Sequence, residues 1–317
     1  MTGTVTIPWK SVLAILFKNI ETGDIHRDVL LYIRLPRVIL AAAVGASLGT
    51  AGAVFQGLFR NPMADPYVLG VSSGAALGAI VAILTGGSLY FAGFTAVPLF
   101  AFLGGVLSIT LVYYLARVGK AVPVMTLLLA GIAVSAFLSA LVSLLTYFSG
   151  DKLHQVVFWM MGGLGGASWL QLLAMLPYVL VGYSIIYYYA RELNILLLGE
   201  ETALQLGVET EKVKKILMAG ASLLVAAAVS TSGIIGFIGL IVPHFIRLAV
   251  GPDHRFLLPA SALLGASILI AADTLARTII SPTELPVGII TAMVGAPVFI
   301  FLLKKRKKLR YFNSSEG

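Results

Sequence analysis

The sequence predicts an all-α membrane protein, a polytopic bundle of helices, and three features of its composition carry this prediction. Of the 317 residues, 59% are hydrophobic and only 11% are charged, and the mean hydropathy is +0.97. A soluble domain carries about 25% charged residues, so this chain cannot cover a water-facing surface. A membrane span must satisfy its own backbone hydrogen bonds, and these Leu-, Ala-, Gly- and Val-rich runs lack the alternation of barrel strands. The spans are therefore expected to be helices.

The length of the chain limits what else it can contain. With about 20 residues per span, it has room for roughly eight to ten spans and short connections. Little is left for a separate soluble domain, so we expect any nucleotide-hydrolysing module to lie on another chain.

Uncharged windows of the sequence place the individual spans. The first lies between Arg37 and Arg60, and the stretch 65–117 is long enough for two spans with a break near Gly86. Residues 151–167 are rich in glycine and predict a short re-entrant or surface helix with its turn. The remaining windows expected to cross the membrane are 121–150, 168–190, 216–246, 256–272 and 286–303.

The window 216–246 is long for one crossing and short for two, and the distribution of positive charge decides between them. The loop 191–215 and the tail 304–317 are both basic and are expected to face the cytoplasm. Both can do so only if 216–246 crosses twice, so we predict two short helices with a break near Ser230–Gly233. The total is then nine spans.

This topology divides the chain into three parts: an external N-terminal segment (1–37), a transmembrane domain (38–303) and a basic cytoplasmic tail (304–317). The N-terminal segment carries basic residues on the side that the charge bias disfavours, and residues 11–20 predict at most a short amphipathic surface helix. Either this segment is translocated against the bias, or a preceding helix is absent from the chain. We favour the absent helix.

The distribution of charges also indicates what this chain does not do alone. Six basic residues at 304–310 form a cytoplasmic anchor rather than a nucleic-acid site. The chain has no Cys, and its four His lack ligand spacing, so we expect no metal centre and no bound cofactor. No phosphate-binding G-x-x-x-x-G-K-[ST] motif is present. Ser72 lies in a G-x-S-x-G pattern, but it opens a membrane helix without the Asp and His partners of a hydrolase.

The predicted span interiors hold no carboxylate, which favours a transporter driven from outside the chain. An ion-coupled secondary carrier remains the alternative. The loop 191–215 predicts two short helices punctuated by Gly199 and Gly207. It is either an interfacial helix pair or a docking surface for a cytoplasmic partner. Small residues at helix-packing intervals predict close helix contacts; they are Gly45, Gly49 and Gly52, then Gly70, Gly74 and Gly78, then Gly104 and Ser108.

Several phrases together resemble the FecCD-type permease subunits of ABC importers for iron-siderophores, haem and vitamin B12. In chain order they are RLPR at 34–37, NPMADP at 61–66, LGV at 69–71, WMMGG at 159–163, LGE at 198–200, GFIGLIVPH at 236–244 and ELPVG at 284–288. The resemblance runs from about residue 34 to residue 304. It implies a type II ABC importer permease fold, typically of ten helices, in a prokaryotic cytoplasmic membrane. It also implies a homodimer, two cytoplasmic ATPase subunits that bind ATP and Mg, and an external substrate-binding protein.

The resemblance further implies roles for particular residues. ATPase coupling would involve Leu198, Gly199, Glu200, Ala203, Leu206 and Gly207. Docking of the binding protein would involve Arg34, Arg37 and Arg277. The gates and the pathway would involve Asn61, Pro62, Met63, Val124, Met125, Met160 and Met161. The carried chelate is left open among iron-siderophore, haem and cobalamin.

Overall fold

The computed structural model describes residues 8, 11–12, 15, 25–86, 90–91, 94–119 and 121–314. Within these residues six helices are long and apolar enough to cross a membrane, judged by length and composition, and three shorter apolar helices accompany them. Together they occupy the nine predicted windows. The all-helical membrane fold predicted from the sequence is confirmed.

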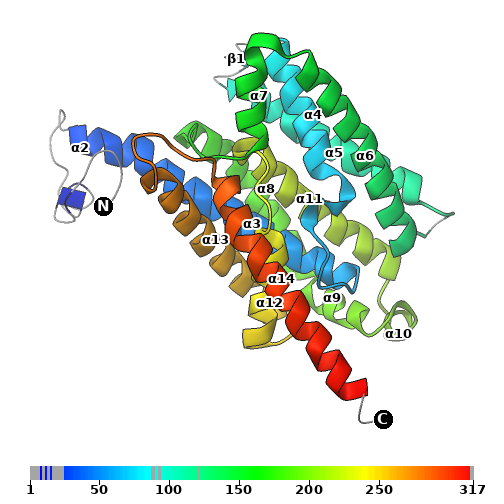
Figure 1. Cartoon of the computed structure of the whole chain (residues 1–317). Coiled ribbons are helices and arrows are strands. Elements are labelled where there is room, and N and C mark those ends of the chain that lie inside the picture. Colours follow the sequence, from blue (N-terminus) through cyan, green and yellow to red (C-terminus); the bar gives the residue numbers. More distant parts are fainter. Residues whose placement is uncertain are drawn as a thin grey trace.

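The helices form one elongated bundle (Figure 1). A hairpin of two short strands, β1 (Tyr90–Phe91) and β2 (Phe94–Thr95), joins α4 to α5 near the break predicted at Gly86. The helical elements in chain order are α2 (Ile25–Asp28), η1 (Val29–Arg34), α3 (Leu35–Leu58), η2 (Pro66–Leu69), α4 (Val71–Leu84), α5 (Ala96–Ala116), α6 (Val124–Tyr147), η3 (Gly150–Lys152), α7 (Leu153–Met160), α8 (Trp169–Tyr188), α9 (Ala190–Leu197), α10 (Glu200–Gln205), α11 (Thr210–Ser232), α12 (Ile238–Val250), α13 (His254–Thr278) and α14 (Val287–Ser314).

Helix α3 lies at the centre of one half of the bundle, between α11, α12 and α13. Its row of small residues, Gly45, Gly49 and Gly52, allows the backbones of α12 and α13 to come close to it. A Cβ atom added to Gly52 would overlap the carbonyl oxygen of Gly239 in α12, and one added to Gly45 would overlap that of Gly265 in α13. Lipid provides no hydrophobic force between helices, so close backbone contact is a main source of their association. The predicted packing role of this row is confirmed.

A second row of small residues joins α4 to α5. A Cβ atom on Gly74 would overlap the carbonyl oxygen of Gly104, and the reverse holds for Gly104 and Gly74. The hydroxyl of Ser108 donates a hydrogen bond of 2.8 Å to the carbonyl oxygen of Gly70. Helices α4, α5 and α6 therefore form a compact group on the other side of the bundle from α13 (Figure 1).

Helix α4 has only 14 residues because it begins halfway along its neighbours. The start of α4 at Gly70 lies beside Ser108 and Ser135, which are near the middle of α5 and α6. After α3 the chain turns back into the bundle through η2, where the Asp65 carboxylate accepts a 2.7 Å hydrogen bond from the Tyr67 N–H. The sequence predicted a full span here and missed this re-entrant segment.

The predicted break in the window 216–246 is confirmed. Helix α11 ends at Ser232 and α12 begins at Ile238, and both Gly233 and Phe237 have positive φ angles, 66° and 69°. The hydroxyl of Tyr67 donates a 2.9 Å hydrogen bond to the Ile235 carbonyl in this break. Helix α11 begins earlier than predicted, at Thr210, so the basic residues 212–215 belong to its first turns rather than to the preceding loop.

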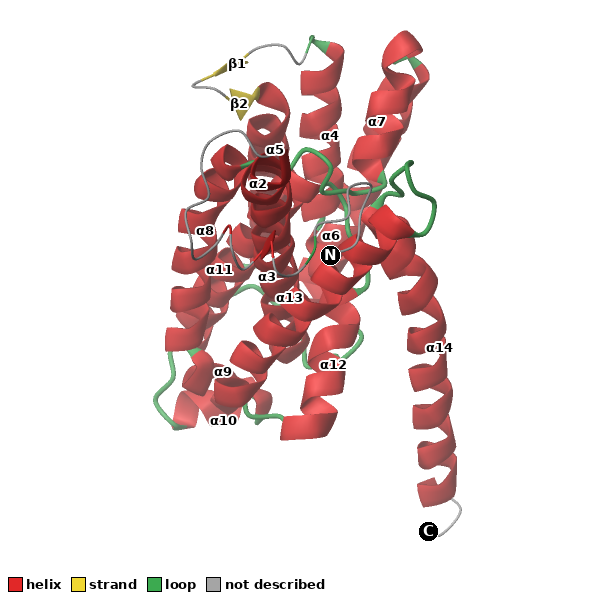
Figure 2. Ribbon diagram, turned by 90° about the vertical axis from the view of Figure 1, so that its left-hand side faces the viewer, coloured by secondary structure: helices red, strands yellow, loops and turns green. Residues whose placement is uncertain are grey.

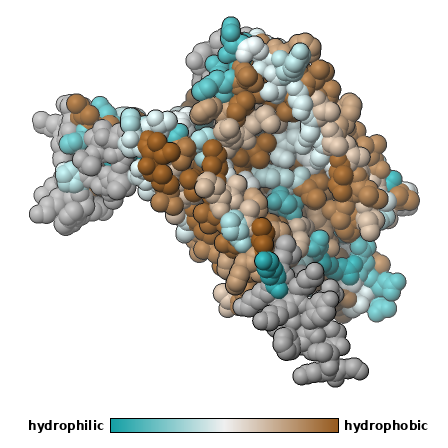
Figure 3. Space-filling model, viewed as in Figure 1, coloured by the Kyte–Doolittle hydropathy of each residue, from teal (hydrophilic) through white to brown (hydrophobic). Residues whose placement is uncertain are grey.

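Helical structure also extends beyond two predicted windows: the helix of the first span begins at Ile25, inside the predicted external segment 1–37, and α14 continues to Ser314, inside the predicted tail 304–317. Helix α7 and its turn occupy the glycine-rich segment 151–167. Helix α14 runs along the edge of the bundle, and its C-terminal half extends beyond it (Figure 2). Brown, hydrophobic side chains cover much of the flank of the bundle, and teal ones gather near α10 (Figure 3). The predicted surface helix over 11–20 lies mostly outside the described residues.

The contact between α3 and α12 gives a stability prediction. The substitution Gly52→Ala forces the two backbones apart and is expected to lower stability by about 1–3 kcal/mol, as overpacking does. Thermal unfolding in detergent measures it. Gly236→Ala is the matched control, because a Cβ there meets no atom within 4 Å; equal melting temperatures for the two variants would contradict the packing role.

Candidate functional site

One end of the bundle, where α3 begins, carries a buried cluster of charged side chains around Arg37. The Arg37 side chain is 7% exposed and its Nη2 lies 2.9 Å from Asp273 Oδ1 in α13. Its Nη1 donates a 2.8 Å hydrogen bond to Glu284 Oε2 in the loop before α14. Arg37 therefore ties α3, α13 and the start of α14 together, and its planar guanidinium suits this bidentate arrangement.

Arg277 belongs to the same cluster. Its Nε lies 3.1 Å from Asp273 Oδ2, one helical turn away, and its side chain is 12% exposed. Arg34 is half-buried at the end of η1, close enough for its charge to interact with that of Arg277. Arg37 and Arg277 thus share the buried Asp273 carboxylate, and Arg37 also binds Glu284.

This arrangement corrects the prediction for Arg37. A docking contact needs an exposed guanidinium, whereas Arg37 is 6% exposed and saturated by two carboxylates of its own chain. The sequence placed Asp273 and Glu284 at span ends but gave no sign that Arg37 would turn inward to meet them. By the same criterion Arg277 is poorly placed for docking, since it is 12% exposed and paired with Asp273; Arg34, which is only half-buried, meets the criterion better.

The opposite end of the bundle carries the loop predicted to contact a partner (Figure 1). The structure confirms two short helices, α9 and α10, separated by Gly199 and followed by Gly207, with φ angles of 120° and 83°. Leu198 and Leu206 are 66% and 59% exposed. Two large apolar side chains beside α10 are therefore exposed on the surface of the chain.

Two members of this loop behave differently from the prediction. Ala203 is fully buried against the protein's own core, because it lies on the inner face of α10, and it cannot enter a partner's groove. Glu200 is partly buried and binds Lys214 of α11 at 3.1 Å. Leu204, which the sequence reasoning missed, is 57% exposed and extends the apolar surface of Leu198 and Leu206. Its exposure follows from the helical spacing, since Leu204 and Ala203 are neighbours on different faces.

Helix α9 is also fastened to the start of α13, a contact that the sequence did not reveal. The Asn194 side-chain amide donates to Asp253 Oδ1 at 2.7 Å, and its oxygen accepts from the His254 N–H at 2.9 Å. Hydrogen bonds from Arg255 to the Asp253 carboxylate hold the pKa of Asp253 well below its usual range. The only available sequence signal was Asp253, an N-cap type of residue, three positions before the predicted span 256–272.

The gate candidates lie in two loops. Asn61 is exposed, while Pro62 and Met63 line a crevice with α12 and α14 that leaves no room for a water molecule. Val124 and Met125 begin α6, and Met125 is 69% exposed. The crevice is completed by Leu240, His244, Phe299 and Leu302.

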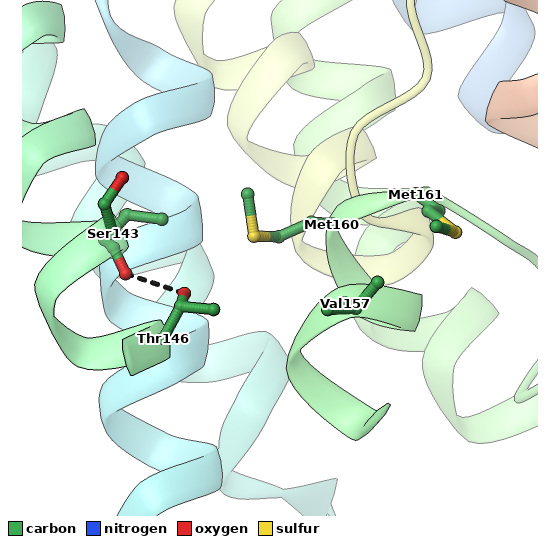
Figure 4. Close-up of a pocket in the computed structure, with 6 residues that line it drawn as sticks. Ser143, Thr146, Val157, Met160 and Met161 are labelled. Carbon is green, nitrogen blue, oxygen red and sulfur yellow. Dashed lines mark hydrogen bonds between the residues drawn. The ribbon is translucent and has the colours of Figure 1, made fainter. Parts of the chain in front are cut away.

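The pathway candidates line a cavity of about 470 Å³ between α6 and α7. Met160 points across the cavity toward Ser143 and Thr146 of α6, and the Thr146 hydroxyl donates to the Val142 carbonyl at 2.7 Å (Figure 4). Met161 and Val157 complete the lining. The wall contains thioether, methyl and hydroxyl groups and no charged side chain, and methionine side chains adapt to surfaces of different shape.

These sites contain no arrangement for covalent chemistry. Among the described residues no three His, Asp or Glu side chains lie close enough to hold a metal ion. The polar clusters lie at the two ends of the bundle and the uncharged cavity lies between helices. The described residues thus form a polytopic helical membrane bundle with polar clusters at its two ends.

Comparisons with known proteins place this chain in a family. The chain matches the FecCD transport family over residues 1–305. It is 48% identical over 303 residues to the cobalamin import system permease protein BtuC of Halobacterium salinarum, covering 95% of this chain and 80% of that relative. It is 44% identical over 301 residues to the hemin transport system permease protein HmuU of Yersinia pestis, covering 92% and 88%.

A solved structure agrees with these relatives. A metal-chelate type ABC transporter in an inward-facing conformation superimposes with a TM-score of 0.82 at 37% identity, over 93% of this chain and 96% of that chain. The chain belongs to the FecCD transport family and is a permease subunit of an ABC importer, a transport component rather than an enzyme.

The Arg37 cluster gives a second stability prediction. Arg37→Met leaves Asp273 with less compensation in a buried site, and breaking a buried pair costs about 3–5 kcal/mol. We expect the low end of this range, because Glu284 is 46% exposed and water can solvate it. The melting temperature in detergent measures the loss. Lys212→Met is the control, since its ion pair with Glu209 is exposed and contributes little; a similar loss there would contradict this prediction.

Proposed function

We propose that the chain is the membrane-spanning subunit of an ATP-driven importer that moves a large metal chelate inward. Two copies would meet at a twofold axis and alternate in access, with two cytoplasmic ABC ATPase subunits and an external binding protein attached. The observation that carries this proposal is the α9–α10 loop, which exposes leucines at one end of an otherwise lipid-facing bundle. Membership in a family of ABC importer permeases supports ATP coupling over the alternative, an ion-coupled secondary carrier.

In this proposal ATP and Mg bind the partner ATPases, and the helices of this chain transmit the resulting motion through the membrane. Closure of the ATPases moves α10 through its exposed leucines, and rigid-body motion of packed helices changes access at a gate. Asn194 fastens α9 to the start of α13, and α13 packs along α3. Motion of the loop therefore reaches the helices that carry the Arg37 cluster.

Arg34, with the less exposed Arg277 near it, is the proposed contact for carboxylates of the binding protein, and Asp273 links Arg37 to Arg277. Such surface charges mainly set orientation and association rate. This end faces outward in the proposal, while α10 and the basic tail of α14 face the cytoplasm of a prokaryotic plasma membrane.

The carried solute is proposed from the cavity and from the relatives together. The cavity wall is uncharged, which suits a bulky solute whose specificity is set elsewhere. Relatives are named for import of cobalamin and of hemin, and the similar solved structure for metal chelates. We therefore propose that the cargo is cobalamin, haem or an iron-siderophore, each of which is a bulky metal chelate.

Reconstitution tests this function directly. The chain is co-purified with its ABC ATPase, placed in liposomes with internal ATP and Mg, and given cobalamin, haem or a ferric siderophore together with the binding protein. We expect accumulation of one of these solutes that requires ATP and survives an uncoupler. Accumulation driven by an ion gradient without ATP would overturn the proposal.

The exposed leucines give a binding prediction. Leu206→Ala and Leu198→Ala remove anchors from the proposed ATPase contact, and each is expected to weaken ATPase association by about 5- to 30-fold, the effect of 1–2 kcal/mol. Titration of detergent-solubilised permease with labelled ATPase measures the Kd.

The matched control is Leu263→Ala. Leu263 is 71% exposed but lies within α13, away from α10, so its loss should leave the Kd unchanged. An unchanged Kd for both loop variants as well would remove this loop from the ATPase contact.

A further inference from the structure

We propose that Lys214 and Glu211 of α11 form a relay that carries motion of α10 to the turn between α5 and α6, immediately before the gate candidates Val124 and Met125. This inference deepens the proposed function and rests on it. It assigns positioning roles to two residues outside the loop that contacts the ATPase.

The first contact of the relay joins α10 to α11. Lys214 Nζ lies 3.1 Å from Glu200 Oε2, and the Lys214 side chain is 7% exposed. Glu200 is the first residue of α10, directly after Gly199. Lys214 also pairs with Glu211 one turn earlier in α11. The buried Lys214 ammonium therefore binds two carboxylates. Displacing Glu200 would weaken one of these ion pairs and leave Lys214 paired mainly with Glu211.

The second contact joins α11 to the turn before α6. The Val122 N–H donates a 2.9 Å hydrogen bond to Glu211 Oε2, while the other oxygen of the same carboxylate faces Lys214. Glu211 thus connects an ion pair on one side to a backbone amide on the other. Charge-assisted hydrogen bonds of this kind are stronger than neutral ones.

The turn that receives this contact is braced internally. Val118 and Ala121 exchange two backbone hydrogen bonds, 2.9 and 3.1 Å long. The Thr126 hydroxyl donates to the Ala116 carbonyl at 2.9 Å, which ties the first turn of α6 to the end of α5. A pull on the Val122 amide is therefore passed to the start of α6 instead of being absorbed by a loose loop.

Burial of Lys214 distinguishes the relay from a neighbouring ion pair that is exposed to water. Lys212 and Glu209 lie 3.6 Å apart in the same segment, but their side chains are 62% and 74% exposed. Water and salt screen such a pair. Lys214 is shielded, so its interactions are stronger and respond more to a small displacement of a partner.

The experiment uses the absence of Cys from the chain. Val118→Cys places a single thiol in the α5–α6 turn, at a side chain that is 60% exposed. A spin label there reports the distance between the two copies in the complex with the ABC ATPase, measured with and without ATP and Mg. In the otherwise unchanged chain we expect ATP to shift the populations of two distances.

Variants then test the relay. In Glu211→Met and Lys214→Met we expect the ATP-dependent population ratio to fall by about 2- to 30-fold, the range seen along coupled networks, with ATPase association retained. Glu211→Gln keeps an oxygen for the Val122 amide and Lys214→Arg keeps the charge, so both should preserve part of the shift. These conservative variants also serve if the Met variants fold poorly. Glu209→Gln is the matched control and should behave as the parent.

Each outcome separates the relay from the proposed function. A full ATP-dependent shift in Glu211→Met and Lys214→Met overturns the relay, and so does ATP hydrolysis without any shift at residue 118 of the parent. If the parent forms no dimer or does not associate with the ATPase, the proposed function itself fails, and the relay with it.

Discussion

The structure depends on the close approach of α3 to α12 and α13. In a bilayer the hydrophobic effect does not press helices together, so contact between backbones must supply much of the cohesion. Gly45 and Gly52 allow it because a side chain at either position would overlap a carbonyl oxygen of the facing helix. With α3 fixed in this way, Arg37 at its start is brought to Asp273, and its far end leads into the segment that re-enters the bundle.

The charged groups follow a common plan at both ends of the molecule. At one end Arg37 bridges Asp273 and Glu284, and at the other Lys214 bridges Glu200 and Glu211. The Arg37 bridge joins helices far apart in the sequence, whereas the Lys214 bridge joins α10 to the neighbouring α11. In both, the basic side chain is only 7% exposed, and removing a partner of a buried charge is costly. The charged side chains therefore fasten helices to one another at the two ends of the bundle, while the wall of the cavity between α6 and α7 is uncharged.

The sequence predicted the features that leave a local signal. Uncharged windows located the helices, Gly233 marked the break between α11 and α12, and Gly199 marked the turn between α9 and α10. Features that arise from distant contacts were not predictable. Nothing near Arg37 in the sequence indicates that it turns inward to Asp273, and Ala203 is buried only because α10 rests on the core. The re-entrant segment before α4 was also missed, because residues 66–84 are uncharged and long enough for a span, and the breaks at Pro66 and Gly70 were not used.

That re-entrant segment has a mechanical consequence. It meets the break before α12 through the Tyr67–Ile235 hydrogen bond, so two unwound stretches lie together inside the bundle. Irregular backbone is tolerated at such depth only when protein covers it, and here α3, α5 and α6 do so. Without a continuous helical ladder these stretches resist bending less than the helices on either side. Because the Tyr67–Ile235 hydrogen bond joins them, a displacement of one stretch is passed to the other, and so to the start of α4 or of α12.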